Sequence, residues 1–112
     1  MAMTDEAYVK KRLKAFFNAN ANYWYMPTTG GYGRSGAPDF LPVIKDGRVW
    51  GIECKGRGRN KTTHLQRLEL EKLFAAGFSV AVVDRDNIER FEDIFLKTDG
   101  IVDCRRSSDY PE

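Results

Sequence analysis

Apolar residues recur along the chain at spacings that predict helices and strands in alternation. The first stripe has helical spacing and consists of Val9, Leu13, Phe16 and Phe17. Thr4 has a side chain suited to a helix N-cap, and the acidic residues Asp5 and Glu6 suit the positive end of a helix dipole. The pattern predicts a first helix that begins after Thr4 and ends near Asn20.

Two strand-like runs follow, from Phe40 to Ile44 and from Val49 to Lys55. The residues between them contain Asp46-Gly47, a strong hairpin-turn signal, so we expect an antiparallel pair. An aromatic run from Tyr23 to Met26 predicts a short strand before Pro27. Four glycines between Thr28 and Gly36 indicate a loop that leads to Asp39.

The next segment predicts a helix followed by a strand. Thr62 or Thr63 is the expected cap, and Gly77 is the expected C-terminal stop. The helix carries the apolar residues Leu65, Leu68, Leu73 and Phe74. The run from Phe78 to Val83 has the composition of a buried strand. Strand, helix and strand in this order predict a right-handed crossover with parallel strands, and hence a mixed sheet.

A third helix is predicted from the capping-box spacing of Asp86 and Glu89. Its apolar side consists of Ile88, Phe91, Ile94 and Phe95. The tail from Asp99 onward is expected to add a short edge strand or to remain partly loose. The elements together predict an α/β fold in one domain over residues 1–112, with a core over about 4–86 and a C-terminal helix and tail over 87–112.

Composition agrees with one globular domain. The 112 residues are 42% hydrophobic and 30% charged, and the net charge is +2. No apolar run reaches the roughly 18 residues that span a bilayer, and the N-terminus lacks a secretory pattern, so we expect a cytosolic protein without a membrane partner. Cys54 and Cys104 share no metal-ligand spacing and are expected to be reduced thiols.

Candidate chemistry lies in the predicted hairpin. Strand alternation puts Glu53 and Lys55 on one face, and Asp39 opens the partner strand, so the two carboxylates are expected to converge. Oxygen ligands of this kind suit Mg²⁺. The alternative is that Glu53 and Lys55 form a partly exposed ion pair while Asp39 ends a loop.

Basic residues follow the hairpin without an intervening acid. Lys55, Arg57, Arg59 and Lys61 alternate through a glycine-containing stretch, which suits phosphate contacts but is also common on ordinary solvated surfaces. Tyr32 and Arg34, in the glycine-rich loop, are further candidates for contacts with a nucleic acid, or ordinary loop residues. His64 is better explained as an exposed residue in the first turn of a helix than as a general base.

The motifs Gly36-Ala37-Pro38-Asp39-Phe40 and Ile52-Glu53-Cys54-Lys55-Gly56, with Gln66 in the following helix, resemble those of the VRR-NUC domain, the virus-type replication-repair nuclease branch of the PD-(D/E)XK superfamily. The resemblance covers residues 4–86 and implies a restriction-endonuclease-like core. It also implies that Asp39, Glu53 and the Cys54 carbonyl bind metal, that Lys55 positions the attacking water and that Gln66 organises the site. A glutamate on the first helix reaches the metals in similar nucleases; Glu6 is the candidate here, with a surface acid as the alternative.

The resemblance further implies a stand-alone nuclease, dependent on Mg²⁺ or Mn²⁺, in the cytoplasm of a bacterium or phage-infected host. Small members of the family resemble phage and bacterial proteins that act as homodimers on branched DNA, including four-way Holliday junctions, in DNA repair. Two other functions stay open: a catalytically silent DNA-binding module with a nuclease fold, and an unrelated protein-interaction domain.

Overall fold

A computed structural model of the chain describes residues 3–27, 36–57, 62–98 and 100–105. Within these ranges the helices are α1 (Asp5–Asn20), α2 (His64–Ala75) and α3 (Ile88–Lys97). The strands are β1 (Tyr23–Tyr25), β2 (Leu41–Ile44), β3 (Arg48–Cys54), β4 (Ser79–Val83) and β5 (Asp103–Cys104). The described elements appear in the order that the sequence pattern predicts.

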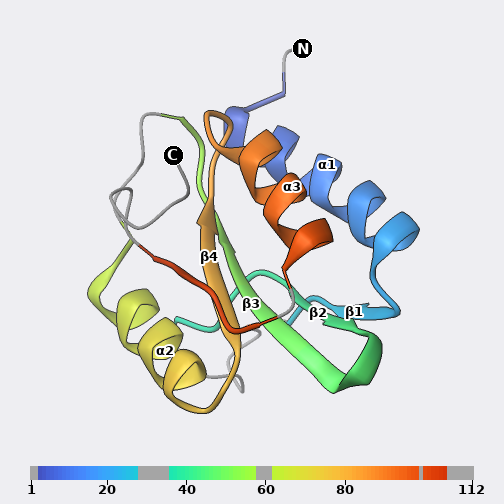
Figure 1. Cartoon of the computed structure of the whole chain (residues 1–112). Helices are drawn as coiled ribbons and strands as arrows, with labels where there is room; N and C mark the ends of the chain where they lie inside the picture. The colour runs from blue at the N-terminus through green and yellow to red at the C-terminus, as the bar shows by residue number, and fades with distance from the viewer. Residues whose placement is uncertain (1–2, 28–35, 58–61, 99, 106–112) are drawn as a thin grey trace.

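The strands form one mixed sheet in the order β1-β2-β3-β4-β5. The first three strands are antiparallel neighbours, whereas β3–β4 and β4–β5 are parallel pairs. Helices α1 and α3 cover one face of the sheet and α2 covers the other (Figure 1). The predicted α/β fold with a mixed sheet, a hairpin and a crossover through α2 is therefore confirmed, and β5 is the short edge strand expected from the tail.

The main core lies between the sheet and the pair α1 and α3. It contains Val9, Leu13 and Phe17 from α1, Trp50, Ile52 and Cys54 from β3, and Ile88, Phe91 and Phe95 from α3. Aromatic rings meet edge to face: Phe17 and Phe40 lie 5.4 Å apart between ring centroids, and Trp50 and Phe91 lie 5.5 Å apart. This packing fixes α1 against the sheet near the strand ends where Asp39 and Glu53 lie.

The hairpin turn between β2 and β3 spans Lys45–Gly47. Asp46 and Gly47 have φ angles of 76° and 80°, a left-handed conformation that Asp and Gly adopt more readily than most residues. Ile44 pairs with Arg48 and Val43 with Val49. The turn therefore sets the register that brings the start of β2 beside the end of β3.

Helix α2 packs on the opposite sheet face through Leu70 and Leu73. A Cβ atom at Gly51 would lie 2.7 Å from Leu73 Cδ1, so a glycine in β3 allows this close approach. Leu65 and Leu68, by contrast, are 51% and 38% exposed. Leu68 lies two residues before Leu70 and therefore on the opposite side of the helix, so part of the apolar surface of α2 faces outward.

The capping box predicted at Asp86 and Glu89 is wrong. Asn87 is the N-cap of α3, and its side chain makes no capping hydrogen bond to the helix. The buried carboxylate of Asp84 accepts hydrogen bonds from the backbone N–H groups of Asp86 and Asn87, at 2.8 and 2.9 Å. An aspartate at the end of β4 thus forms the turn into α3, because its side chain bonds backbone groups two and three residues ahead.

Among the described residues, no helix is long and apolar enough to cross a membrane.

Candidate active site

Asp39 lies immediately before β2, where pairing with β3 ends. Its backbone N–H donates to the carbonyl of Ile52 at 2.8 Å, and its carboxylate Oδ2 accepts from the backbone N–H of Cys54 at 2.7 Å. Phe40 pairs with Ile52, and the same register continued by one residue places Asp39 opposite Glu53. The hairpin thus brings the two carboxylates to one strand end, as the sequence pattern predicts.

Glu53 is almost fully enclosed, with 3% of its surface exposed. Its Oε2 accepts a hydrogen bond from Gln66 Nε2 at 2.6 Å and lies 3.6 Å from Lys55 Nζ. Burial raises the pKa of Glu53 to about 8; the negative charge of Asp39 adds to the rise, and Lys55 opposes it. The strand end therefore holds a buried acid whose ionised form needs more positive charge than Lys55 supplies.

Gln66 joins the start of α2 to Glu53 in β3 and to Lys55, the residue that follows β3. Its Oε1 accepts hydrogen bonds from Lys55 Nζ at 2.8 Å and from the backbone N–H of Thr63 at 2.9 Å. Thr63 Oγ1 in turn accepts from the backbone N–H of Gln66, which completes a capping box. The same amide therefore caps the helix and orients Glu53 and Lys55.

Gly36 is a second positioning feature of α2; the sequence pattern placed it at the end of a loop and at the start of the Gly36–Phe40 motif, without a contact to α2. It has a φ of 80°, and a Cβ atom there would lie 2.6 Å from the backbone carbon and oxygen of Leu65. Only glycine lets the chain before Asp39 run this close to the first turn of α2. Its place three residues before the strand-end acid was the available sequence signal.

On the α1 side, Lys10 contacts two acids at once. Its Nζ lies 3.2 Å from Glu6 Oε2 and 3.7 Å from Asp39 Oδ1. Partial burial disfavours the charged form of Lys10, but Asp39 and Glu6 outweigh it, so the pKa of Lys10 is raised above its ordinary value. Glu6 therefore reaches the site through Lys10. The sequence reading missed Lys10, although its spacing of four residues from Glu6 was a signal for an ion pair.

Cys54 turns its backbone toward the acids and its thiol away from them. The N–H of Cys54 donates to Asp39, and the N–H and C=O of one strand residue point to the same neighbour, so the carbonyl also faces the side of Asp39. Cys54 is 1% exposed and belongs to the core, and burial raises the pKa of its thiol well above the ordinary value. Cys54 can thus offer a backbone oxygen, whereas its sulfur is an inert core group.

The donors available for a cation are oxygens. In the part of the chain that the structure describes, no three His, Cys, Asp or Glu side chains gather closely enough to form a metal-holding group. The strand end offers two carboxylates, Asp39 and Glu53, and the Cys54 carbonyl. Mg²⁺ commonly binds one or two protein carboxylates and keeps several waters, so the chemistry of this donor set fits Mg²⁺ or Mn²⁺.

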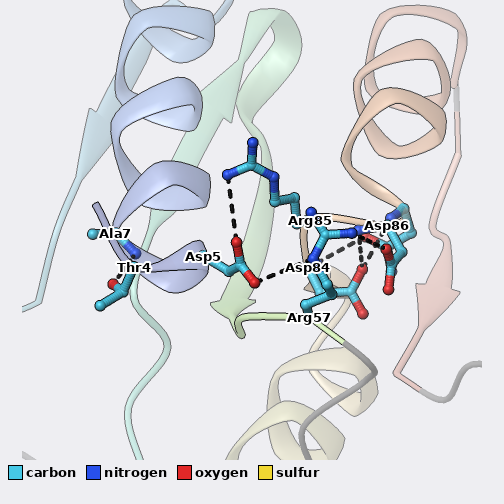
Figure 2. Close-up of polar contacts among 8 residues, drawn as sticks. Thr4, Asp5, Ala7, Arg57, Asp84, Arg85 and Asp86 are labelled. Atoms are coloured by element: carbon cyan, nitrogen blue, oxygen red, sulfur yellow. Dashed lines mark hydrogen bonds and ion pairs between the residues drawn. The ribbon is translucent and has the colours of Figure 1, made fainter. Parts of the chain in front are cut away.

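Arg57, two residues beyond Lys55, is held by carboxylates from two helix starts. Figure 2 shows its guanidinium between Asp5 and Asp86, with contacts of 3.2 Å and 3.3 Å. Arg85 also contacts Asp5, at 3.4 Å, and its guanidinium carbon lies 3.8 Å from the ring centroid of Tyr8. Arg57 remains 55% exposed, so it ties β3 to α1 and α3 while keeping a surface toward solvent.

The remaining candidates fall into two groups. Tyr32, Arg34, Arg59 and Lys61 lie outside the residues that the structure describes. His64 is the exposed first residue of α2. The structure therefore brings together Asp39, Glu53, Lys55 and Gln66, adds Lys10 with Glu6 on one side, and places Arg57 at the edge of the same region.

Comparison with known proteins gives two similar proteins, and no protein-family model matches the chain. The chain is 39% identical over 56 residues to the protein named "Putative nuclease p44" of Acyrthosiphon pisum secondary endosymbiont phage 1. The aligned part is 50% of this chain and 59% of the phage protein, so the match spans little more than half of that relative. A solved structure titled "VRR_NUC domain" has a TM-score of 0.68 and 28% identity, over 81% of this chain and 97% of that one.

The mixed sheet, which has five strands in the described part of the chain, and its flanking helices form an α/β domain with the fold of that VRR_NUC domain. The chain is therefore similar in fold to a VRR-NUC domain and, over part of its length, similar in sequence to a phage protein named as a nuclease.

Proposed function

We propose that this protein is a nuclease that hydrolyses phosphodiester bonds of DNA with the help of a divalent metal ion, Mg²⁺ or Mn²⁺. The proposal rests on the union of Asp39, Glu53, Lys55 and Gln66 at one strand end, with contacts of 2.6 to 3.6 Å linking the last three. The VRR-NUC fold and the name of the phage relative support nuclease activity.

Asp39, Glu53 and the Cys54 carbonyl would hold the metal. A bound divalent ion of this kind neutralises phosphate charge and lowers the pKa of a bound water. Before binding, Asp39 is fixed by the Cys54 amide and Glu53 by Gln66, so both oxygens are already oriented. Preorganised ligands of this kind avoid the cost of ordering side chains when the cation arrives.

Lys55 would act on the attacking water and on the developing charge of the phosphate. Its side chain is 12% exposed, and its ammonium donates a hydrogen bond to Gln66 Oε1 and lies close to Glu53. An ammonium has three donors, so one can remain for a water or a phosphate oxygen while Gln66 and Glu53 hold the others. Gln66 is a positioning residue: it contacts Lys55 and Glu53 and orients both.

The basic residues Arg34, Arg57, Arg59 and Lys61 would contact the DNA backbone. Arg57 is the member of this set with a described environment, and its bonds to Asp5 and Asp86 would be exchanged for phosphate oxygens on binding. Exposed ion pairs are worth little in water, so such an exchange costs little.

We further propose that the protein prefers branched DNA, such as four-way junctions, and acts as a homodimer in DNA repair. This preference is what the resemblance of the sequence motifs to the VRR-NUC family implies, and a two-fold dimer would present two equivalent active sites to a substrate with two strands to cut. Light scattering with and without DNA, and cleavage of four-way, flap, nicked and linear DNAs of matched sequence, test these two points.

The deciding experiment compares wild-type protein with Glu53→Gln on that DNA panel, in EDTA, Mg²⁺ or Mn²⁺. We expect the wild-type protein to cleave DNA only when Mg²⁺ or Mn²⁺ is present. We expect Glu53→Gln to lose cleavage, because the variant keeps the side-chain size but loses a metal ligand. Glu89→Gln, on the exposed side of α3, is the matched control and should cleave like wild type. DNA binding without cleavage under every metal condition would instead identify a silent DNA-binding module.

A further inference from the structure

Two lysines flank the strand-end acids, and they are held differently. Lys55 lies in a closed environment, 12% exposed, with Gln66 and Glu53 as partners. Lys10 comes from the opposite side, on α1, is 34% exposed and contacts Glu6 and Asp39. The proposed function gives Lys55 a role but leaves Lys10 unexplained.

The two oxygens of Asp39 have separate partners. Oδ2 accepts from the backbone N–H of Cys54 at 2.7 Å, whereas Oδ1 faces Lys10 Nζ at 3.7 Å. The oxygen that the backbone leaves available is therefore the one that Lys10 neutralises. An ammonium only donates and carries a full positive charge, so it opposes a second cation at the same oxygen.

Glu6 is occupied by the same ammonium. Its Oε2 lies 3.2 Å from Lys10 Nζ, one helical turn away on α1. Lys10 thus holds an acid of α1 and an acid just before β2 together across an interface between two elements. The lysine stem is flexible and a third of the side chain is already in contact with solvent, so the head group can move outward without unfolding the helix.

We propose that Lys10 is a displaceable counter-cation of the metal-free site: it neutralises Asp39 and Glu6 until a divalent ion takes Asp39 and the ammonium moves away. This inference rests on the proposed function, because it assumes that the strand end binds a divalent ion. Lys10 would lower the affinity for that ion while stabilising the acids in its absence, and removing it would reverse both effects.

The test is a calorimetric titration of the purified protein with Mn²⁺ in the absence of DNA. Lys10→Met should bind Mn²⁺ roughly tenfold more tightly than wild type, the effect of one unit charge about 6 Å from a divalent ion in a water-like medium. Lys10→Arg keeps the charge and should bind no more tightly than wild type. Lys11→Met removes the same charge from the adjacent, exposed position of α1 and should change affinity by less than about twofold.

A second readout is thermal unfolding in EDTA and in Mn²⁺. Lys10→Met should melt below wild type in EDTA and gain more than wild type on addition of Mn²⁺, since a ligand that binds the folded state more tightly stabilises it more. Lys11→Met should follow wild type in both conditions. If Lys10→Met folds poorly, Lys10→Gln serves instead, because it keeps a polar end on α1.

Asp39→Asn separates the possible failures. If Mn²⁺ binds wild type, is lost in Asp39→Asn and binds Lys10→Met with unchanged or lower affinity, the counter-cation role is overturned while metal binding by the site stands. If Mn²⁺ binds none of the proteins, the inference and the metal dependence of the proposed function both fail. Tighter binding in Lys10→Met, with Lys11→Met unchanged, supports the inference.

Discussion

The candidate active site has two sides, one around Glu53 and one around Lys10, and they differ in how their charged side chains are held. At one end, Glu53 is buried between Lys55 and Gln66, and each contact comes from a strand or from a capped helix. At the other end, Lys10 bridges Glu6 and Asp39 from the surface of α1, with a third of its side chain exposed. The first end is built into the fold, whereas the second can rearrange.

This difference means that Glu53 has a fixed orientation, whereas the contacts of Lys10 are open to solvent. A buried acid bonded to a fixed amide keeps its orientation, and changes in its charge act strongly on stability because water screens it poorly. A partly exposed lysine between two acids contributes less to stability, because water and salt screen its charge. The contrast predicts large effects of substitution at the buried end and small, salt-dependent effects at the exposed end.

The largest effect is expected for Glu53→Gln on DNA cleavage. Loss of a metal ligand should lower the cleavage rate by on the order of a thousandfold, comparable to removal of a group that stabilises transition-state charge. Single-turnover cleavage in Mg²⁺ measures this, with the Glu89→Gln protein as control. A Glu53→Gln enzyme with near wild-type cleavage would place the chemistry elsewhere.

The pH dependence of stability should reveal the same buried acid. Glu53 has an ordinary pKa of 4.5 in the unfolded chain and a pKa of about 8 when folded. Between these values the unfolded chain has released a proton that the folded protein retains, so this group stabilises the fold at low pH, and the contribution is lost as pH rises toward 8. At about 1.4 kcal/mol for each unit of pKa, the total is a few kcal/mol.

Urea unfolding of the metal-free protein in EDTA, from pH 5 to pH 9, measures it. The free energy of unfolding of wild type should fall relative to that of Glu53→Gln across this range, because the amide cannot ionise. Parallel curves for the two proteins would show that Glu53 ionises normally in the folded state.

Next in size is the pair Gln66→Ala and Thr63→Ala. Both break the capping box and should lower the free energy of unfolding by about 1 kcal/mol. Only Gln66→Ala also frees Glu53 and Lys55, so it should lower the cleavage rate by a further 10- to 100-fold, the usual range for a residue that orients a metal ligand. Equal rates for the two variants, once both are shown to be folded, would remove the positioning role of Gln66.

The smallest effect is expected for Glu6→Gln on stability. It removes one partner of the partly exposed Lys10 side chain, so the free energy of unfolding should change by less than about 1 kcal/mol, and by less still at high salt. Denaturant unfolding at low and high NaCl measures it, with Glu89→Gln as the control for a lost surface charge. A larger loss that persists in salt would mean that Glu6 is held as firmly as Glu53.

Much of the fold could be predicted because its signals are local. The stripe of Val9, Leu13 and Phe17 has the period of a helix, and Asp46-Gly47 favours a tight turn wherever it occurs between two strands. The cap of α3 could not be predicted in this way, since the Asp84 side chain, just after β4, accepts the backbone hydrogen bonds at the turn into the helix. The spacing of Asp86 and Glu89 pointed to Asp86, whereas the structure shows the Asp84 carboxylate bonded to the backbone N–H groups of Asp86 and Asn87.

In the site, the sequence determined the contacts that follow from the hairpin register, and the tertiary structure decided the contacts made by α1. Asp39, Glu53 and Lys55 meet because a turn of fixed length between two strands dictates which residues face each other, and this can be read along the chain. Lys10 meets Asp39 only because α1 packs on the sheet through its aromatic core, 29 positions away in sequence. The short-range contacts follow from backbone geometry, whereas the long-range ones depend on how whole elements pack.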